Sequence, residues 1–112
     1  MKKIELNIRV TSLLDIEGNI VTIFNETTGK GKLKKEYSNL IFEIDYPLST
    51  PVFVFIPIAK HIADILIPIA KAYKKIYSDP KKYGVWGHLI EDLYFEGIGI
   101  KENGVCKLYI GS

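Results

Sequence analysis

Two short arrangements of histidine and carboxylate residues are the parts of this sequence that could support acid-base or metal chemistry. His61 precedes Asp64 by three residues. His88 precedes Glu91 by three residues and Asp92 by four. On a helix these spacings place an imidazole and a carboxylate on one face, and two such pairs together could hold a metal ion. Because such short spacings often arise by chance, we expect no metal, and we assign His61 to a helix-surface pair and His88 to packing or capping.

Other motifs of catalysis do not occur. The sequence contains no HExxH, CxxC, GxxxxGK[ST] or GxSxG pattern. The GIG at 97–99 precedes no predicted helix, which a dinucleotide fingerprint would require. The single cysteine, Cys106, lies in the apolar phase of a predicted strand, where a small buried thiol is expected instead of a nucleophile. We therefore predict no catalytic residue and no cofactor, and we lean away from an enzyme.

Aromatic and acidic residues gather after the predicted helix and form the best candidate for a partner or ligand surface. They are Tyr83, Trp86, His88, Glu91, Asp92 and Glu96. A tryptophan in such a cluster can be a recognition residue, but a large aromatic side chain is more often buried. We expect Trp86 to belong to the core.

Glu96 has two interpretations that depend on the phase of the strand around it. If alternation continues back from Ile98, the carboxylate faces the core, where an unpaired charge is costly. If a bulge at Gly97 shifts the phase, Glu96 faces solvent while Leu93 and Phe95 turn inward. We favour the bulge.

The element that must position these residues is the one long stretch with helical periodicity, from Pro57 to Ser78. Its apolar residues recur at spacings of three or four, which places them on one stripe that needs a sheet to cover it. They are Ile58, Ile62, Ile65, Ile69, Tyr73 and Ile76. Pro68 in the middle predicts a kinked helix but no break.

The apolar run from Val52 to Ala72 approaches the length of a membrane span. Charged residues occupy its middle, where each costs roughly 2.5 kcal/mol or more, so we predict no membrane segment. The first ten residues alternate apolar with polar and lack the continuous apolar stretch of a signal peptide. A lone cysteine also fits a reducing compartment. We expect a cytoplasmic protein.

Strand patterns precede the helix. Apolar residues alternate from 4 to 16, and Gly18-Asn19 predicts a hairpin into a second strand. This register pairs Leu13 with Phe24 on the outer face. The two residues are either an isolated exposed pair or an apolar surface that binds a partner.

Two further strands are predicted before the helix. Residues 27–35 form a predicted lysine-rich loop, and Ser38 to Tyr46 alternate as a third strand that stops at Pro47. Val52 to Ile56 is apolar on both faces, which predicts a short buried strand. The alternative is a backward extension of the helix from Thr50.

The last predicted elements are a hairpin of residues 94–101 and 105–110. A two-residue turn at Asn103-Gly104 would mix apolar and polar residues on each face. A three-residue loop with Gly104 left-handed keeps the apolar side chains together and lays Tyr109 over Gly97. The apolar face then consists of Ile98, Ile100, Cys106, Leu108 and Ile110.

Composition restricts the function classes. The chain has 112 residues and a net charge of +2, and Arg9 is its one arginine among the basic residues. So small a charge, carried mostly by lysine, makes nucleic-acid binding a poor hypothesis. We predict a single α+β domain over 1–112: an antiparallel twisted sheet of order β-β-β-β-α-β-β, with one long Pro-kinked helix packed on one face.

The leading functional hypothesis is a small protein-protein interaction module of the kind represented by bacterial immunity proteins and antitoxins. Its candidate surfaces are Leu13 with Phe24, and the cluster of Trp86, His88, Glu91, Asp92 and Glu96. The alternative is a small-molecule enzyme or ligand-binding protein with a site between the helix and the C-terminal hairpin. A homodimer formed through a sheet edge is compatible with either hypothesis.

Overall fold

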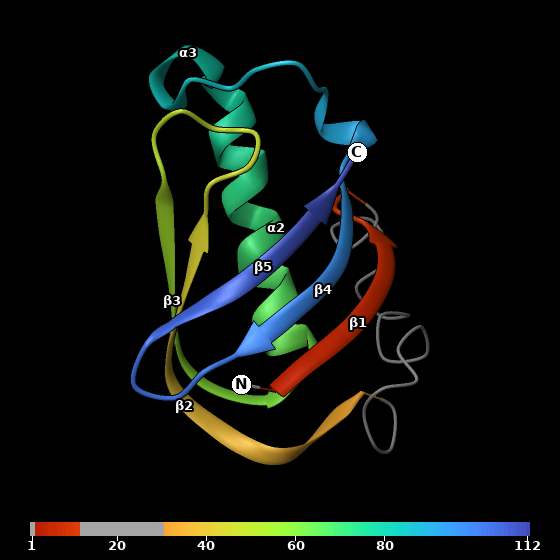
Figure 1. Ribbon diagram of the computed structural model, residues 1–112, viewed down its shortest axis with the longest axis vertical. Helices are drawn as coiled ribbons and strands as arrows, with labels where there is room; N and C mark the ends of the chain where they lie inside the picture. The colour runs from red at the N-terminus through yellow and green to blue at the C-terminus, as the bar shows by residue number, and fades with distance from the viewer. Residues whose placement is uncertain (1, 12–30) are drawn as a thin grey trace.

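The computed structural model describes residues 2–11 and 31–112. Five strands and one long helix form most of this part of the chain (Figure 1). The strands are β1 (Lys2–Arg9), β2 (Lys32–Ile44), β3 (Val52–His61), β4 (Tyr94–Ile100) and β5 (Val105–Gly111). The helical elements are α2 (Ala63–Ser78), the short α3 (Pro80–Tyr83) and the single turn η2 (Ile90–Asp92). The predicted α+β class is confirmed.

The described strands form one sheet of order β1-β4-β5-β2-β3. Adjacent strands are antiparallel except for a short parallel pairing of β2 with β5, in which Ile41 lies beside Val105 and Phe42 beside Cys106. The prediction of a wholly antiparallel sheet is therefore wrong. Sequence alternation could not show this, because the parallel contact joins two strands that are more than 60 residues apart in the chain.

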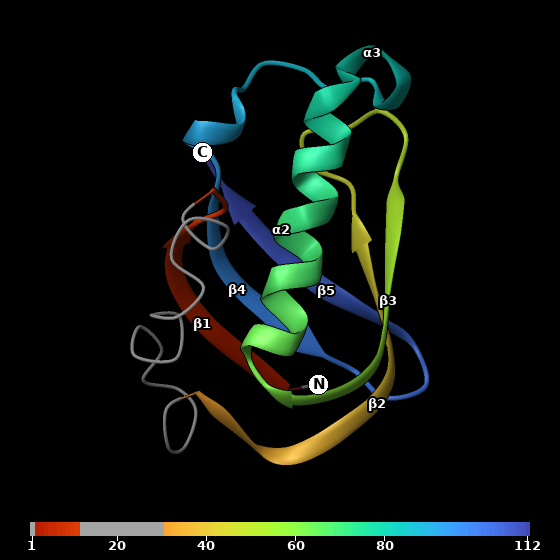
Figure 2. The same cartoon turned by 180° about the vertical axis from the view of Figure 1, so that it is seen from behind.

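Helix α2 packs on one face of this sheet. In Figure 2, β1 and β4 pass on one side of the helix and β3 passes on the other, so the sheet curves around it. The helix buries Ile65, Leu66, Ile69, Ala70, Tyr73 and Ile76. The predicted inward stripe from Ile62 to Ile76 is thus confirmed, and the helix continues through Pro68 without a break.

The predicted start of the helix at Pro57 is wrong. Residues 57–61 are the end of β3, in which Ile58 pairs with Ser38 and Ala59 pairs with Tyr37. Ile58 is 55% exposed and does not belong to the helical stripe. The isoleucines at 56 and 58 suit a strand as well as a helix, and pairing with β2 decides between the two. The preference for a strand at 52–56 over a longer helix is confirmed.

The N-terminal strands follow their predicted alternation in part. Ile4, Leu6, Ile8 and Val10 are buried, as their even spacing predicts. Leu40, Phe42 and Ile44 of β2 are buried as well. Residues 32–35 belong to β2 and not to the predicted loop. The predicted hairpin at Gly18-Asn19, and the surface at Leu13 and Phe24, lie outside the described residues.

The burial pattern of β2 changes phase at Asn39. Asn39 has a φ of 55°, a left-handed conformation that asparagine tolerates better than most residues. The buried residues of β2 change there from Leu33 and Tyr37 to Leu40 and the even positions that follow. Figure 2 shows β2 and β3 curving past the end of α2 at which the helix begins.

The C-terminal hairpin has the predicted register, since Gly97 lies beside Tyr109 and Ile98 beside Leu108. The left-handed residue of its loop is Asn103, with a φ of 59°, and not the expected Gly104. The register shifts between Phe95 and Gly97, which confirms the predicted bulge.

No helix within residues 2–11 and 31–112 is both long enough and apolar enough to cross a membrane. The apolar run from 52 to 72 is divided between β3 and α2.

Candidate functional site

Several exposed large apolar side chains of the described chain lie on β3, which is the last described strand at one end of the sheet. Phe53 and Phe55 each expose 58% of their surface, and they alternate with Ile56 and Val54, which point toward the core. The sequence prediction that this strand is buried on both faces is therefore wrong. Among residues 2–11 and 31–112, β3 has a neighbouring strand on one side alone, which is β2.

The exposed side of β3 continues as an apolar row across three strands. Phe55 pairs with Ile41 on β2, and Ile41 lies beside Val105 on β5. Cross-strand partners point to the same face of a sheet, and Ile41 and Val105 are also exposed. We call Phe53, Phe55, Ile41 and Val105 the apolar row. Their alignment makes one continuous surface out of side chains that are scattered in sequence.

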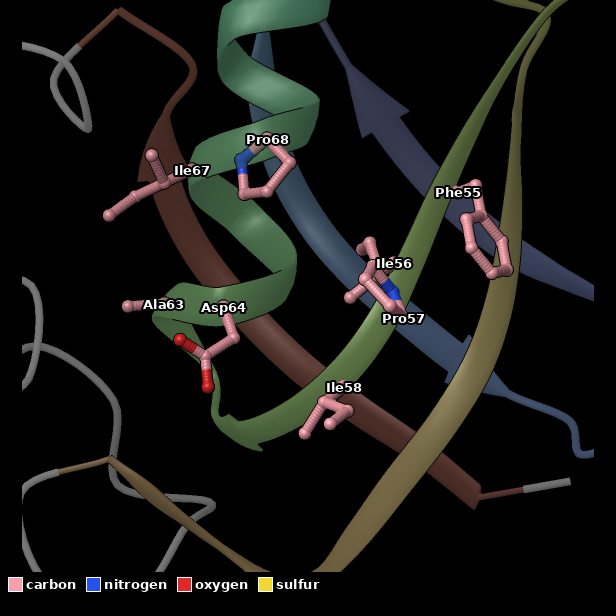
Figure 3. Close-up of a pocket in the computed structure, with 8 residues that line it drawn as sticks. All are labelled: Phe55, Ile56, Pro57, Ile58, Ala63, Asp64, Ile67 and Pro68. Carbon is pink, nitrogen blue, oxygen red and sulfur yellow. The ribbon is translucent and has the colours of Figure 1, made fainter.

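A groove runs along the other side of β3, between this strand and the first half of α2. Its volume is about 310 Å³. We call it the edge groove. Its lining residues are Phe55, Ile56, Pro57, Ile58, Ala63, Asp64, Ile67 and Pro68 (Figure 3). Figure 3 shows Phe55 pointing away from the helix while Ile56 and Pro57 point toward it. Phe55 thus belongs to both the edge groove and the apolar row.

Backbone and carboxylate groups at the start of α2 give the edge groove a small polar component. The Asp64 carboxylate accepts hydrogen bonds from the backbone N–H groups of Lys60 and His61, at 2.9 and 3.0 Å. Pro68 has no N–H, so the carbonyl of Asp64 lacks its usual donor within the helix. The predicted pair of His61 and Asp64 is close in space, with 4.0 Å between Nδ1 and Oδ2, but His61 ends a strand and does not lie on a helix.

The exposed face of α2 becomes cationic beyond the edge groove. Lys71 and Lys75 follow Asp64 and Pro68 by seven residues, which is two helical turns along the same side. Both lysines are exposed, as is the neighbouring Lys74. Asp64 is the one acidic residue between Ala63 and Ser78. The surface beside β3 is therefore apolar at one end and positively charged at the other.

The predicted cluster after the helix is brought together only in part. Trp86 packs edge-on against Tyr46, with ring centroids 5.5 Å apart. It is 50% exposed, so the expectation of a core tryptophan is wrong. His88 lies near both rings, and its Nε2 is 2.8 Å from the Tyr46 hydroxyl. That hydroxyl also lies 2.9 Å from the Oγ of Ser112.

A second cavity, of about 390 Å³, lies beside this aromatic group. It is lined by Arg9, His88, Glu91, Asp92, Tyr94 and Ser112. The Arg9 Nε donates a hydrogen bond of 2.9 Å to the Tyr94 hydroxyl, so the guanidinium is held on one wall. Three of the predicted site residues, His88, Glu91 and Asp92, therefore share one cavity. Glu96 does not line it: it is exposed and lies over Gly111.

Two buried or half-buried tyrosines support the aromatic group from α2. The Tyr73 hydroxyl donates to the Tyr46 carbonyl at 2.7 Å, and the Tyr77 hydroxyl donates to the His88 carbonyl at 3.1 Å. Burial raises the pKa of both tyrosines. Both hydroxyls therefore stay protonated at neutral pH and serve as hydrogen-bond donors that fix the loop after the helix.

Cys106 is buried, as predicted. Within the described parts of the chain, no group of three or more histidine, cysteine, aspartate and glutamate side chains is arranged to hold a metal ion. No family model matches this chain, and no curated protein or solved structure does either.

Sequence reasoning missed the apolar row and the edge groove. The run from 52 to 56 is apolar at every position, and such a run is typical of a central strand buried on both faces. One available signal pointed the other way: Pro51 and Pro57 bracket the run, and proline within a sheet is largely confined to edge strands.

Proposed function

We propose that this chain is a small protein-binding module that holds its partner at the β3 end of the sheet, and that binding neutralises or scaffolds that partner in the manner of an immunity protein or antitoxin. The observation that carries this proposal is that the apolar row and the edge groove meet at Phe55, on the strand that ends the sheet of the described residues.

The physical case rests on the cost of leaving this surface in water. Burying one large apolar side chain is worth roughly 1.5 to 3 kcal/mol relative to exposing it. An exposed apolar strand at a sheet edge is also a site for unwanted pairing, which proteins normally prevent with charges, prolines or a cover. A contiguous apolar surface of this kind is typical of a binding site. A partner that covers β3 would remove both costs.

Partner capture followed by measured rebinding tests the proposal. The tagged full chain is used to retrieve partners from the cells that produce it, and each candidate is then purified and its affinity measured by calorimetry. The double variant F53S/F55S should weaken binding by at least about 100-fold, since two central aromatic anchors are lost. Its fold is checked by circular dichroism.

The matched control removes two exposed apolar side chains elsewhere. Trp86 is 50% exposed and Leu89 is 66% exposed, so W86S/L89S changes a comparable amount of exposed apolar surface outside the β3 region. Affinity should change by less than about threefold. If W86S/L89S abolishes binding while F53S/F55S leaves it intact, the partner binds at the 86–92 cluster and the proposal is wrong about the site.

A second candidate function is the binding of a small polar ligand in the cavity at His88. The specific observation in its favour is that one cationic and two acidic side chains, Arg9, Glu91 and Asp92, line the same cavity as His88. Such a cavity suits a ligand with both a positive and a negative group, such as an amino acid. A thermal-shift screen of the twenty free amino acids tests this, and a ligand that stabilises the native chain but not R9A or H88A would support it.

A further inference from the structure

We infer that the occupant of the edge groove is an extended segment of the partner that adds to β3 as a further strand, with apolar side chains beside Ile56 to Ile58 and acidic side chains beside the lysines of α2. This inference rests on the proposed function and identifies the chemistry of the segment that would be bound.

The backbone of β3 can accept another strand on one side. Within the described chain, β3 is hydrogen-bonded to β2 on one side and lies at the end of the sheet on the other. The N–H and C=O groups on the open side of such a strand are available to another strand, and extended peptides bind to many proteins by this route. Residues 53–56 contain no proline, so every second one of them can offer its N–H group to an added strand.

Helix α2 forms the wall of the edge groove opposite β3. The edge groove lies between the strand and α2, so a peptide added to β3 would lie beside the helix. In an extended peptide successive side chains alternate between the two faces of the sheet. One set would therefore enter the edge groove toward Ile67 and Pro68, while the other set would lie next to Phe53 and Phe55.

The lysines of α2 give one end of the bound segment a preference for acidic side chains. Strand β3 and α2 run in opposite directions, so the C-terminal half of α2 lies near the start of β3 (Figure 2). The hydrogen bond from the Thr50 N–H to the Tyr83 carbonyl, 3.2 Å long, confirms that these two ends meet. By helical periodicity Lys71 and Lys75 lie on the side of α2 that carries Asp64 and Pro68, two turns farther toward the end at which β3 begins. Acidic side chains on the added segment would be attracted there.

The same charges disfavour a second copy of this chain as the occupant. Antiparallel pairing of β3 with itself would bring Lys60 of one copy toward the Val52 end of the other. Lys71 and Lys75 lie toward that end, so cations would face cations. An acidic, extended segment has no such conflict.

The experiment is a selection from a phage-displayed library of random linear twelve-residue peptides against the immobilised full chain. Selected peptides should alternate apolar residues and carry aspartate or glutamate toward one end. Affinity of a synthetic selected peptide is then measured by fluorescence polarisation. The variant K71E/K75E should bind it roughly tenfold more weakly, because two exposed charge pairs become repulsions. The control K101E/K107E makes the same change in charge away from the edge groove and should alter affinity less than twofold.

Backbone methylation provides a readout that side-chain contacts alone would not move. Methylating the backbone nitrogens at alternate positions of the selected peptide should abolish binding in one phase and largely preserve it in the other, because only every second N–H of an added strand faces β3. Equal tolerance of both phases would overturn strand addition.

Other outcomes separate this inference from the proposed function. If the selection yields no peptide, or yields peptides unaffected by K71E/K75E, while F53S/F55S still disrupts binding of the captured partner, the inference fails and the proposed function stands. If F53S/F55S affects no captured partner, the proposed function fails first. A concentration-dependent dimer in sedimentation that F55S converts to monomer would show that a second copy is the occupant, which also overturns the inference.

Discussion

Strands β1 and β3 are the outermost of the described strands, at opposite ends of one sheet, and they differ in what they present to solvent. Both bury an inner face against α2 and the core: Ile4 is 2% exposed on β1, and Ile56 is 2% exposed on β3. The exposed residues of β1 are Lys3, Glu5, Asn7 and Arg9, whereas those of β3 include Phe53, Phe55 and Ile58.

The difference shows that packing of the core alone does not account for the surface of this sheet. Charged residues along an edge strand discourage pairing with another chain, and β1 carries them at Lys3, Glu5 and Arg9. β3 has the same requirement but carries aromatic side chains instead. The contrast is what makes β3 the candidate interface, because solubility and folding are served equally well by the charged pattern of β1.

The largest expected effects are on the free energy of unfolding and concern the buried faces of β1 and β3, which are alike. Ile4→Ala and Ile56→Ala should each lower the free energy of unfolding by about 2 to 5 kcal/mol, because each leaves a cavity in the shared core. Phe55→Ala, on the exposed side of the same strand as Ile56, should change it by less than about 1 kcal/mol. Urea unfolding followed by circular dichroism measures all three. A large loss for Phe55→Ala would mean that the apolar row is part of the fold, and the contrast between the edges would lose its meaning.

Tyr73 joins α2 to the loop at Tyr46 through its hydroxyl. Removal of this hydroxyl should have the next largest effect on the free energy of unfolding. Tyr73→Phe should cost about 1 to 2 kcal/mol, since the Tyr46 carbonyl loses its donor. Burial raises the pKa of Tyr73 above its value in the unfolded chain, so the stabilisation is complete below the ordinary tyrosine pKa of about 10 and is lost as pH rises above it.

The measurement for Tyr73 is urea unfolding at a series of pH values from about 8 to about 11. The native chain should lose more stability over this range than Tyr73→Phe does. Parallel curves for the two proteins would show that Tyr73 does not remain protonated by burial.

Much of the fold could be predicted from sequence where the pattern is local. Alternation located β1, and the spacing of isoleucines located the buried stripe from Ile62 to Ile76. The hydrophobic pattern also chose the register of the last hairpin. These predictions succeeded because each depends on neighbours within a few residues or on a single turn.

The errors arose where pairing with a distant part of the chain determines the secondary structure or the exposure of a residue. Ile58 fits the helical spacing, but pairing with Ser38 makes it part of a strand. The parallel contact of Ile41 with Val105 has no local signal. The candidate site was missed for a related reason, since Phe53 and Phe55 have the same sequence pattern whether the strand lies at the centre of a sheet or at its edge. His88, Glu91 and Asp92 line one cavity, and their closeness in sequence made that proximity predictable.

A smaller effect, on the tendency to aggregate, should follow from exchanging the charged outer face of β1 and the apolar outer face of β3. F53K/F55K gives β3 a charged outer face like that of β1 and should raise severalfold the protein concentration at which nonspecific aggregation, as distinct from a defined dimer, begins. K3F/E5F gives β1 an apolar outer face and should lower that concentration. Static light scattering over a concentration series measures both. If both variants behave like the native chain, the apolar outer face does not govern aggregation.

The most direct measurement places the photoreactive residue benzoylphenylalanine at position 55 and, in a separate protein, at position 5 as the matched site on the other edge. After irradiation in the cells that produce the protein, we expect one discrete crosslinked partner from position 55 and none from position 5. Equal crosslinking from both positions, or a partner captured from position 5 alone, would contradict the claim that β3 is the binding edge.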